Sequence, residues 1–341
     1  MHLSQHGELG EVCRRFGWKP MHIQGDRGIW KVTLPDRELA LKQSDAPYEK
    51  LVLLHRILAS MNQDGFSHSL PWEETTEGNP VVYTGKRCWY AVPWKEKQNR
   101  ELPAQEIVRG LAHLHRISEP VIGMYPELMH KTNDHLVNEW ESKQERLQSY
   151  EEKISSREFP SPFDQSFAQI REQMDRSLAF AIRGMRRFLE TEEGIAPRYV
   201  LCHRRLHPGN VVWDEENFYF IDFDHAQVDS PVRDLALAVH RFADPSDPEN
   251  SPAGLIQAYE EILPLQPKEK KLLALYLSYP ERLLKILSEY SHNPGLSSGE
   301  SQAVSRLEKE KILFEEIQGM VRRLWPVRKK SIGNKGIRKP F

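Results

Sequence analysis

The chain has 341 residues and a mass of 39.8 kDa, and 39% of its residues are hydrophobic, which is enough for one large domain or for two lobes that share a cleft. Its formal net charge of −2 gives no overall sign of binding to nucleic acid or to an anionic membrane. The three cysteines, Cys13, Cys88 and Cys202, lie far apart, which argues against a disulfide framework and a zinc site and favours reduced thiols.

The first part of the chain is predicted to form a short helix and a small sheet. The helix covers residues 9–17 and ends at Gly17, and a second helix opens at Tyr48 and continues to Leu58. Short apolar runs bounded by turn residues predict strands at 21–24, 29–33, 39–42, 79–84 and 87–93. We therefore expect five strands between residues 20 and 93.

The second part of the chain is predicted to be mainly helical. After Pro93, the polar segment 95–100 is typical of a linker, and an amphipathic helix follows from Pro103. Residues 136–158 are charged and helix-forming, and apolar residues recur on one face of a long helix after Pro162. The chain is thus predicted to be α+β, with a β-rich N-terminal lobe at 1–94 and a helical C-terminal lobe at 95–325.

The stretch that carries the most chemistry runs from Cys202 to Ala226 and reads CHRRLHPGNVVWDEENFYFIDFDHA. Two apolar runs, 211–213 and 218–221, flank an acidic turn and predict a β-hairpin that follows a loop. Asn210 precedes the first strand and Asp222 follows the second, so both are expected at the same end of the ladder. Their oxygens suit Mg²⁺, which keeps water or phosphate for its other positions.

These residues resemble the H-x-D-x-x-x-x-N loop and the metal-binding Asp of the protein-kinase-like superfamily. The sequence pattern H-x-x-L-H-P-G-N followed by I-D-F-D resembles that of the aminoglycoside and choline phosphotransferase branch. Residues 277–284 and Glu289-Tyr290 resemble the bacterial spore-coat CotS-type family, in its YsxE-like branch. The resemblance covers most of residues 20–325 and implies a two-lobed protein-kinase-like fold.

The resemblance also implies roles in the N-terminal lobe. Gly25 and Gly28 would lie over the phosphates of a nucleotide, although two glycines in a tight hairpin do not require a ligand. Lys42 would reach the phosphates and form an ion pair with Glu49 across the cleft wall. A solvated lysine at a strand end is the alternative.

In the C-terminal lobe the resemblance implies ATP and Mg²⁺ as cofactors. His203 would belong to the catalytic-type loop, and Asn210 and Asp222 would hold the metal. Asp234, at the start of a helix predicted from Pro231, would brace the loop from below. A carboxylate that only stabilises a helix N-terminus is the alternative for Asp234.

One position departs from the family pattern. Arg205 stands where the family has its catalytic Asp, five residues before Asn210. A guanidinium has no acceptor lone pair and does not deprotonate, so it cannot take the proton of a substrate hydroxyl. We expect it to pair with Asp222 or Asp224, because an unpaired charge in a cleft is costly. The sequence thus predicts a pseudokinase that binds ATP and Mg²⁺ weakly.

Three functions stay open. The CotS-type resemblance implies a structural or interaction component of the spore coat, with other spore-coat proteins as partners and no required cofactor. The second is an active ATP-dependent phosphotransferase for a small-molecule acceptor, with His207 or Asp224 as the base. The third is a metal-dependent hydrolase that uses His203, His207 and Asp222 as ligands.

The two ends of the chain give weaker signals. The segment MHLSQHGELG lacks an apolar h-region, and no run approaches the roughly 18 apolar residues of a membrane span, so cytoplasmic synthesis is expected. The spore coat as location is implied by the resemblance alone. Residues 326–341 are predicted to be a flexible basic tail, which either solubilises the protein or docks on an acidic partner.

Overall fold

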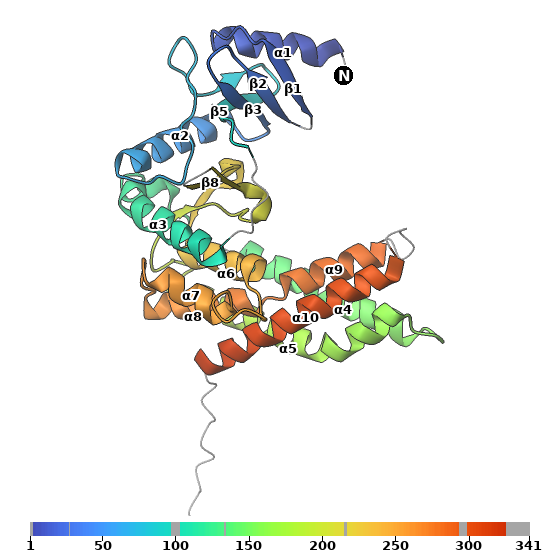
Figure 1. The fold of residues 1–341 in the computed structure, drawn as a ribbon. Helices are drawn as coiled ribbons and strands as arrows, with labels where there is room; N and C mark the ends of the chain where they lie inside the picture. Colours follow the sequence, from blue (N-terminus) through green and yellow to red (C-terminus); the bar gives the residue numbers. More distant parts are fainter. Residues whose placement is uncertain are drawn as a thin grey trace, which may run out of the picture.

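The computed structural model describes residues 3–26, 28–96, 103–132, 134–214, 217–292 and 299–324, and it shows two lobes (Figure 1). The first lobe holds an antiparallel sheet, and the second is built mainly of helices. The predicted α+β class and two-lobed arrangement are therefore confirmed. The predicted basic tail, 326–341, and residues 97–100 of the predicted linker lie outside the described residues.

The sheet of the first lobe has five strands in the order β1-β2-β3-β5-β4. They are β1 (His22–Asp26), β2 (Ile29–Thr33), β3 (Glu38–Ser44), β4 (Val82–Tyr83) and β5 (Cys88–Pro93). Successive side chains of a strand point to opposite faces, so the fully buried Leu39 and Leu41 lie on one face of β3 and Lys42 lies on the other. This alternation turns Lys42 toward the second lobe.

Two helices accompany the sheet. Helix α1 (Leu3–Arg15) covers the face that carries the two buried leucines, and it starts earlier than the predicted residue 9. Helix α2 (Tyr48–Gln63) buries Ile57, Leu58 and Met61 in the same apolar core as α3 (Ala104–Gly123) of the second lobe. Because α2 packs on α3, it links the two lobes.

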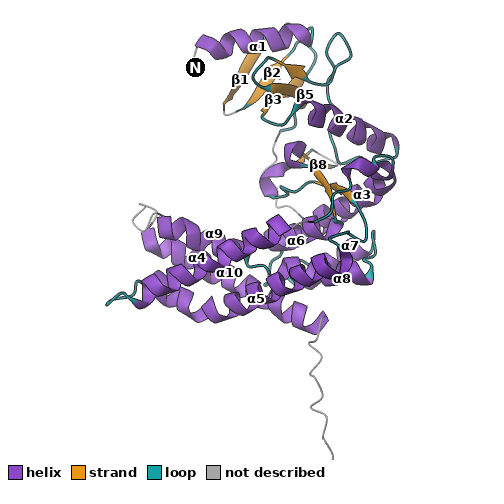
Figure 2. Cartoon of the chain, turned by 180° about the vertical axis from the view of Figure 1, so that it is seen from behind, coloured by secondary structure: helices purple, strands orange, loops and turns teal. Residues whose placement is uncertain are grey.

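The second lobe is a stack of helices (Figure 2). Helices α4 (Asp134–Ser155), α5 (Pro162–Glu192), α9 (Glu281–His292) and α10 (Gly299–Leu324) lie side by side as its outer layer. Between them and α3 lie α6 (Pro231–Phe242), α7 (Pro252–Glu260) and α8 (Pro267–Ser278), and η1 (Pro126–Leu128) is a short 3₁₀ turn after α3.

The predicted apolar face of α5 is confirmed, since Phe167, Ile170 and Met174 are buried. Among the described residues, no helix has the length and apolarity that crossing a bilayer requires.

Two small ladders position the loop between the lobes. The predicted hairpin is confirmed as β7 (Val211–Trp213) paired with β8 (Phe218–Phe220), and it follows the 3₁₀ turn η2 (Pro208–Asn210). A second ladder, which the sequence did not predict, pairs β6 (Val200–Cys202) with β9 (Gln227–Asp229). The 3₁₀ turn η3 (Phe223–His225) connects β8 to β9. The chain thus enters and leaves the loop region through neighbouring strands.

We expect Gly110→Ala to lower the free energy of unfolding by about 1–3 kcal/mol, because there is no room for an added methyl group at this position. A Cβ on Gly110 would lie 2.4 Å from Cζ of Phe218, which is buried where α3 meets the hairpin. Gly123, at the end of the same helix, has nothing within 4 Å of such a Cβ and supplies the matched control. Urea unfolding of both variants checks this, and equal stability of the two would contradict it.

Candidate active site

The loop is held from below by Asp234. Its carboxylate lies in the first turn of α6, is fully buried, and accepts the backbone N–H groups of His203 and Arg204, the latter at 2.9 Å. Burial by itself would raise the pKa of Asp234, but the hydrogen bonds it accepts and its contact with His115 outweigh this effect, so the pKa is lowered. The carboxylate therefore stays ionised and fixes the loop backbone.

His203 ties the loop to the strand that leads to Asp222. Its Nε2 lies 2.8 Å from the carbonyl oxygen of Ile221, and its Nδ1 accepts the N–H of Arg205 at 3.4 Å. Burial lowers the pKa of this imidazole, so it is neutral near pH 7. Because both ring nitrogens are engaged, His203 is not available as a metal ligand, and the hydrolase hypothesis loses one of its three ligands.

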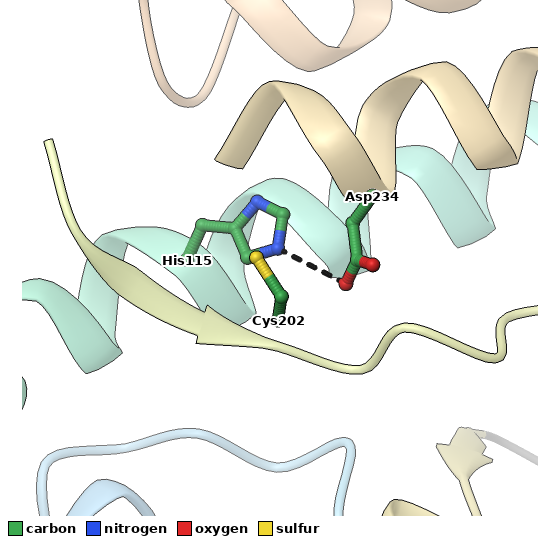
Figure 3. A group of neighbouring side chains, drawn as sticks. All are labelled: His115, Cys202 and Asp234. Atoms are coloured by element: carbon green, nitrogen blue, oxygen red, sulfur yellow. Dashed lines mark ion pairs between the residues drawn. The ribbon is translucent and has the colours of Figure 1, made fainter. Parts of the chain in front are cut away.

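A different trio stands close together beneath the loop (Figure 3). Within the described residues, His115, Cys202 and Asp234 bring their ligand atoms within 4.8 Å of one another, and His115 Nε2 lies 3.5 Å from Asp234 Oδ2. Burial raises the pKa of the Cys202 thiol well above its usual value, whereas a metal requires the thiolate. Asp234 already binds two backbone N–H groups. We read the trio as a structural brace.

Asn210 and Asp222 lie at the same end of the hairpin, as predicted. Asn210 Nδ2 donates to the carbonyl oxygen of Arg205 at 2.9 Å and lies 3.4 Å from Asp222 Oδ2. Asp222 has φ 68° and ψ 51°, a left-handed conformation that few residues other than glycine adopt without cost. Such strain is concentrated at functional sites, where surrounding contacts maintain it.

Lys42 enters this site from β3. Its ammonium pairs with Asp222 Oδ1 and lies 2.9 Å from Asp224 Oδ1, which also accepts the hydroxyl of Tyr90 at 2.6 Å. Burial would raise the pKa of Asp224, but the charge of Lys42 and hydrogen bonds from Ser44 and Tyr90 outweigh it and lower the pKa. One lysine thus bridges two carboxylates of the second lobe.

The predicted ion pair between Lys42 and Glu49 is wrong. Glu49 is exposed in the first turn of α2, while the next residue, Lys50, turns inward and donates to the backbone carbonyl of Asp224 at 2.7 Å. Neighbouring residues of a helix point about 100° apart, so only one of the two can face the cleft. Lys50 and Tyr90 are site residues that the sequence analysis missed. The switch from Glu49 to Lys50 is one position in the same helix turn.

The backbone of the first hairpin explains why Gly25 and Gly28 are glycines. A Cβ on Gly25 would lie 2.3 Å from the carbonyl oxygen of Ile29, and Gly28 has φ 91°. These positions therefore require glycine for the turn itself. Contact of Gly25 and Gly28 with phosphate stays a prediction.

Arg205 behaves as predicted from its charge. Its Nη1 lies 3.5 Å from Asp222 Oδ2 and 3.0 Å from His225 Nε2, and its side chain is 55% exposed. A pair with so exposed a guanidinium contributes only about 0–1 kcal/mol. Absence of a general base costs roughly 10²- to 10⁴-fold in rate, or about 3–5 kcal/mol in the barrier. The missing base is therefore the larger of the two effects of Arg205.

The donor set fits a magnesium nucleotide in part. Asp222 and Asp224 bring the hard oxygens that Mg²⁺ prefers, whereas Asn210 turns its amide nitrogen toward Asp222, and Lys42 lies between the two carboxylates. Arg205 and Lys42 already lie against the two oxygens of Asp222, so a metal ion would compete with both. The two alternative bases are also engaged: His207 Nδ1 accepts the N–H of Gly209 at 3.0 Å, and Asp224 holds Lys42 and Tyr90.

A five-stranded lobe that presents a lysine to the carboxylates of a loop and hairpin in a helical lobe defines the protein-kinase-like class of phosphotransferases. A profile of the phosphotransferase enzyme family, APH, matches residues 25–270. The chain belongs to this family.

Solved structures of the same fold are similar over nearly the whole chain. An aminoglycoside phosphotransferase from Alicyclobacillus acidocaldarius has 17% identity and a TM-score of 0.74, with 92% of this chain and 94% of that chain covered. A spectinomycin phosphotransferase in complex with ADP and spectinomycin has 19% identity and a TM-score of 0.61, covering 95% and 99%. An amicoumacin kinase bound to AMP-PNP and Ca²⁺ has 12% identity and a TM-score of 0.52, covering 93% of both. At these identities the likeness establishes the fold.

Proposed function

We propose that this chain is a pseudokinase of the phosphotransferase family, with a structural or interaction role and little phosphoryl transfer. The observation that carries the proposal is Arg205 at the position of the base, with its guanidinium beside Asp222. A permanently charged guanidinium at this position cannot accept a proton. It would also compete with a metal ion for the carboxylate of Asp222. Nucleotide and Mg²⁺ would bind weakly and would not be needed for the role.

The location and partners are proposed from the resemblance of residues 277–284 to the spore-coat CotS-type family, in its YsxE-like branch. Synthesis in the cytoplasm and assembly with other spore-coat proteins would accord with that resemblance. We also propose lobe boundaries at 94/95 and at 325/326, with the basic tail as a docking segment for an acidic partner.

A second candidate is an active ATP-dependent phosphotransferase for a small-molecule acceptor, with His207 or Asp224 as the base. The observation that favours it is the assembly of Lys42, Asn210 and Asp222 at one site. The similar proteins, which are named as aminoglycoside and spectinomycin phosphotransferases and an amicoumacin kinase, support this candidate over the first. Phosphoryl transfer depends largely on positioning and charge, so a displaced base does not forbid it.

A thermal-shift titration with ATP, with and without Mg²⁺, combined with an ADP-release assay, separates the two candidates. For a pseudokinase we expect a small magnesium-dependent shift and turnover at background. Turnover at a rate typical of kinases, roughly 1–100 s⁻¹, would sink the first candidate and support the second.

A further inference from the structure

A cavity of about 710 Å³ opens beside the loop, between helices α4, α6, α8 and α9. This volume lies within the range of small-molecule sites, which is roughly 300–1,000 Å³. Aromatic rings form part of its wall: Trp140 stacks on Tyr279 at 4.8 Å between ring centroids and meets Tyr276 edge-on at 5.9 Å. The aromatic wall would accept a flat or apolar group.

The charge of the lining is opposite in sign to that of the whole chain. Six cationic and three acidic side chains line the cavity, namely Lys143, Arg146, Lys153, Arg204, Arg233 and Lys285, against Glu139, Asp234 and Glu281. Even with the buried Asp234 counted, the cations of the lining outnumber the acids two to one. The formal charge of the chain as a whole is −2.

The cations are incompletely neutralised by the protein. Arg204 and Arg233 share one carboxylate, Asp229, at 3.3 Å and 2.9 Å. Lys143 and Arg146, on α4, form no ion pair with any residue in the described part of the chain. A lining with surplus positive charge is stabilised by a bound anion.

Arg204 adds a backbone observation. Its φ is 65°, a left-handed conformation that glycine adopts without steric cost, and Asp234 holds it there through the Arg204 N–H. Such a conformation persists where surrounding contacts maintain it, and it is concentrated at functional sites. Here the guanidinium forms part of the cavity wall next to the loop.

We infer that this cavity binds an anionic small molecule that carries an aromatic or apolar group, and that it excludes polycations such as aminoglycosides. The inference deepens the proposed function, and only the role given to the bound anion rests on that proposal. In a pseudokinase the anion would be a bound ligand, and in an active enzyme it would be the acceptor. Binding itself requires neither nucleotide nor Mg²⁺.

The test uses pyrene tetrasulfonate, a fluorescent aromatic anion, with anisotropy measured on the full chain without nucleotide or magnesium. Wild-type protein should bind one probe molecule, and Lys143→Glu together with Arg146→Glu should weaken binding at least about tenfold through charge reversal. The neutral pair Lys143→Gln and Arg146→Gln should lie between the two. It also provides a readout if the reversed variant does not fold. The aminoglycoside tobramycin should not displace the probe.

A matched control is available on α5. Arg183 and Arg187 are exposed, lie outside the cavity lining and form no ion pair with a described residue, so reversing both to Glu makes the same change in net charge. This control should bind the probe like the wild type. Absence of probe binding by the wild type, equal loss in both reversed variants, or displacement by tobramycin would each overturn the inference. None of these outcomes depends on the turnover assay, so the two proposals fail separately.

Discussion

Arg205→Asp is expected to raise magnesium-dependent ATP turnover by roughly 10²- to 10⁴-fold over the wild-type protein. The substitution places a carboxylate at the base position and removes the cation that lies 3.5 Å from Asp222 Oδ2. The rest of the site, Lys42, Asn210 and Asp222, is already assembled. ADP release with and without Mg²⁺ measures the effect.

Arg205→Ala separates the two consequences of the arginine. It removes the competing cation without supplying a base, so magnesium-nucleotide affinity should rise by no more than about fivefold, which corresponds to about 1 kcal/mol for an exposed pair. Turnover by this variant should stay at background. The idea fails if the wild type already turns over ATP at roughly 1–100 s⁻¹ and Arg205→Asp brings no increase.

Asp234→Ala is expected to lower the free energy of unfolding by about 3–5 kcal/mol, since a buried, ionised acceptor of two backbone N–H groups is removed. His203, Arg204 and His115 would lose the carboxylate that they face. Urea unfolding followed by circular dichroism measures the change. Asp36→Ala, at a carboxylate whose side chain is 65% exposed, is the control and should stay within about 0.5 kcal/mol of wild type.

The pH dependence of the same contact has a defined sign. Because the pKa of Asp234 is lowered in the fold, its stabilising contribution is fully present above the ordinary Asp pKa of about 3.9 and is lost as the pH falls through the lowered value. The stability difference between wild type and Asp234→Asn should therefore be constant from neutral to mildly acidic pH and narrow in stronger acid. A difference that grows on acidification would contradict this account.

Local patterns in the sequence predicted much of the fold. Apolar residues alternate along β2 and β3 and recur at helical spacing along α5, because one face of each element is buried. A few consecutive residues are enough to show either pattern. The loop and hairpin around Asn210 and Asp222 were predicted in the same way. The β6–β9 ladder was not, because three-residue strands 25 or more positions apart carry no periodic signal of their own.

The sequence alone determined the charges of the site. Arg205 stands in place of a base, and the carboxylates of Asp222 and Asp224 require cationic partners. Which cations they find depends on the tertiary structure. Lys42 bridges Asp222 and Asp224, and Lys50 rather than Glu49 faces the cleft, because the rotation of α2 is set by its packing on α3. The cationic cavity could not be predicted from the sequence either. Its lining comes from four helices and the loop, and the sequence does not show that these segments lie close together in space.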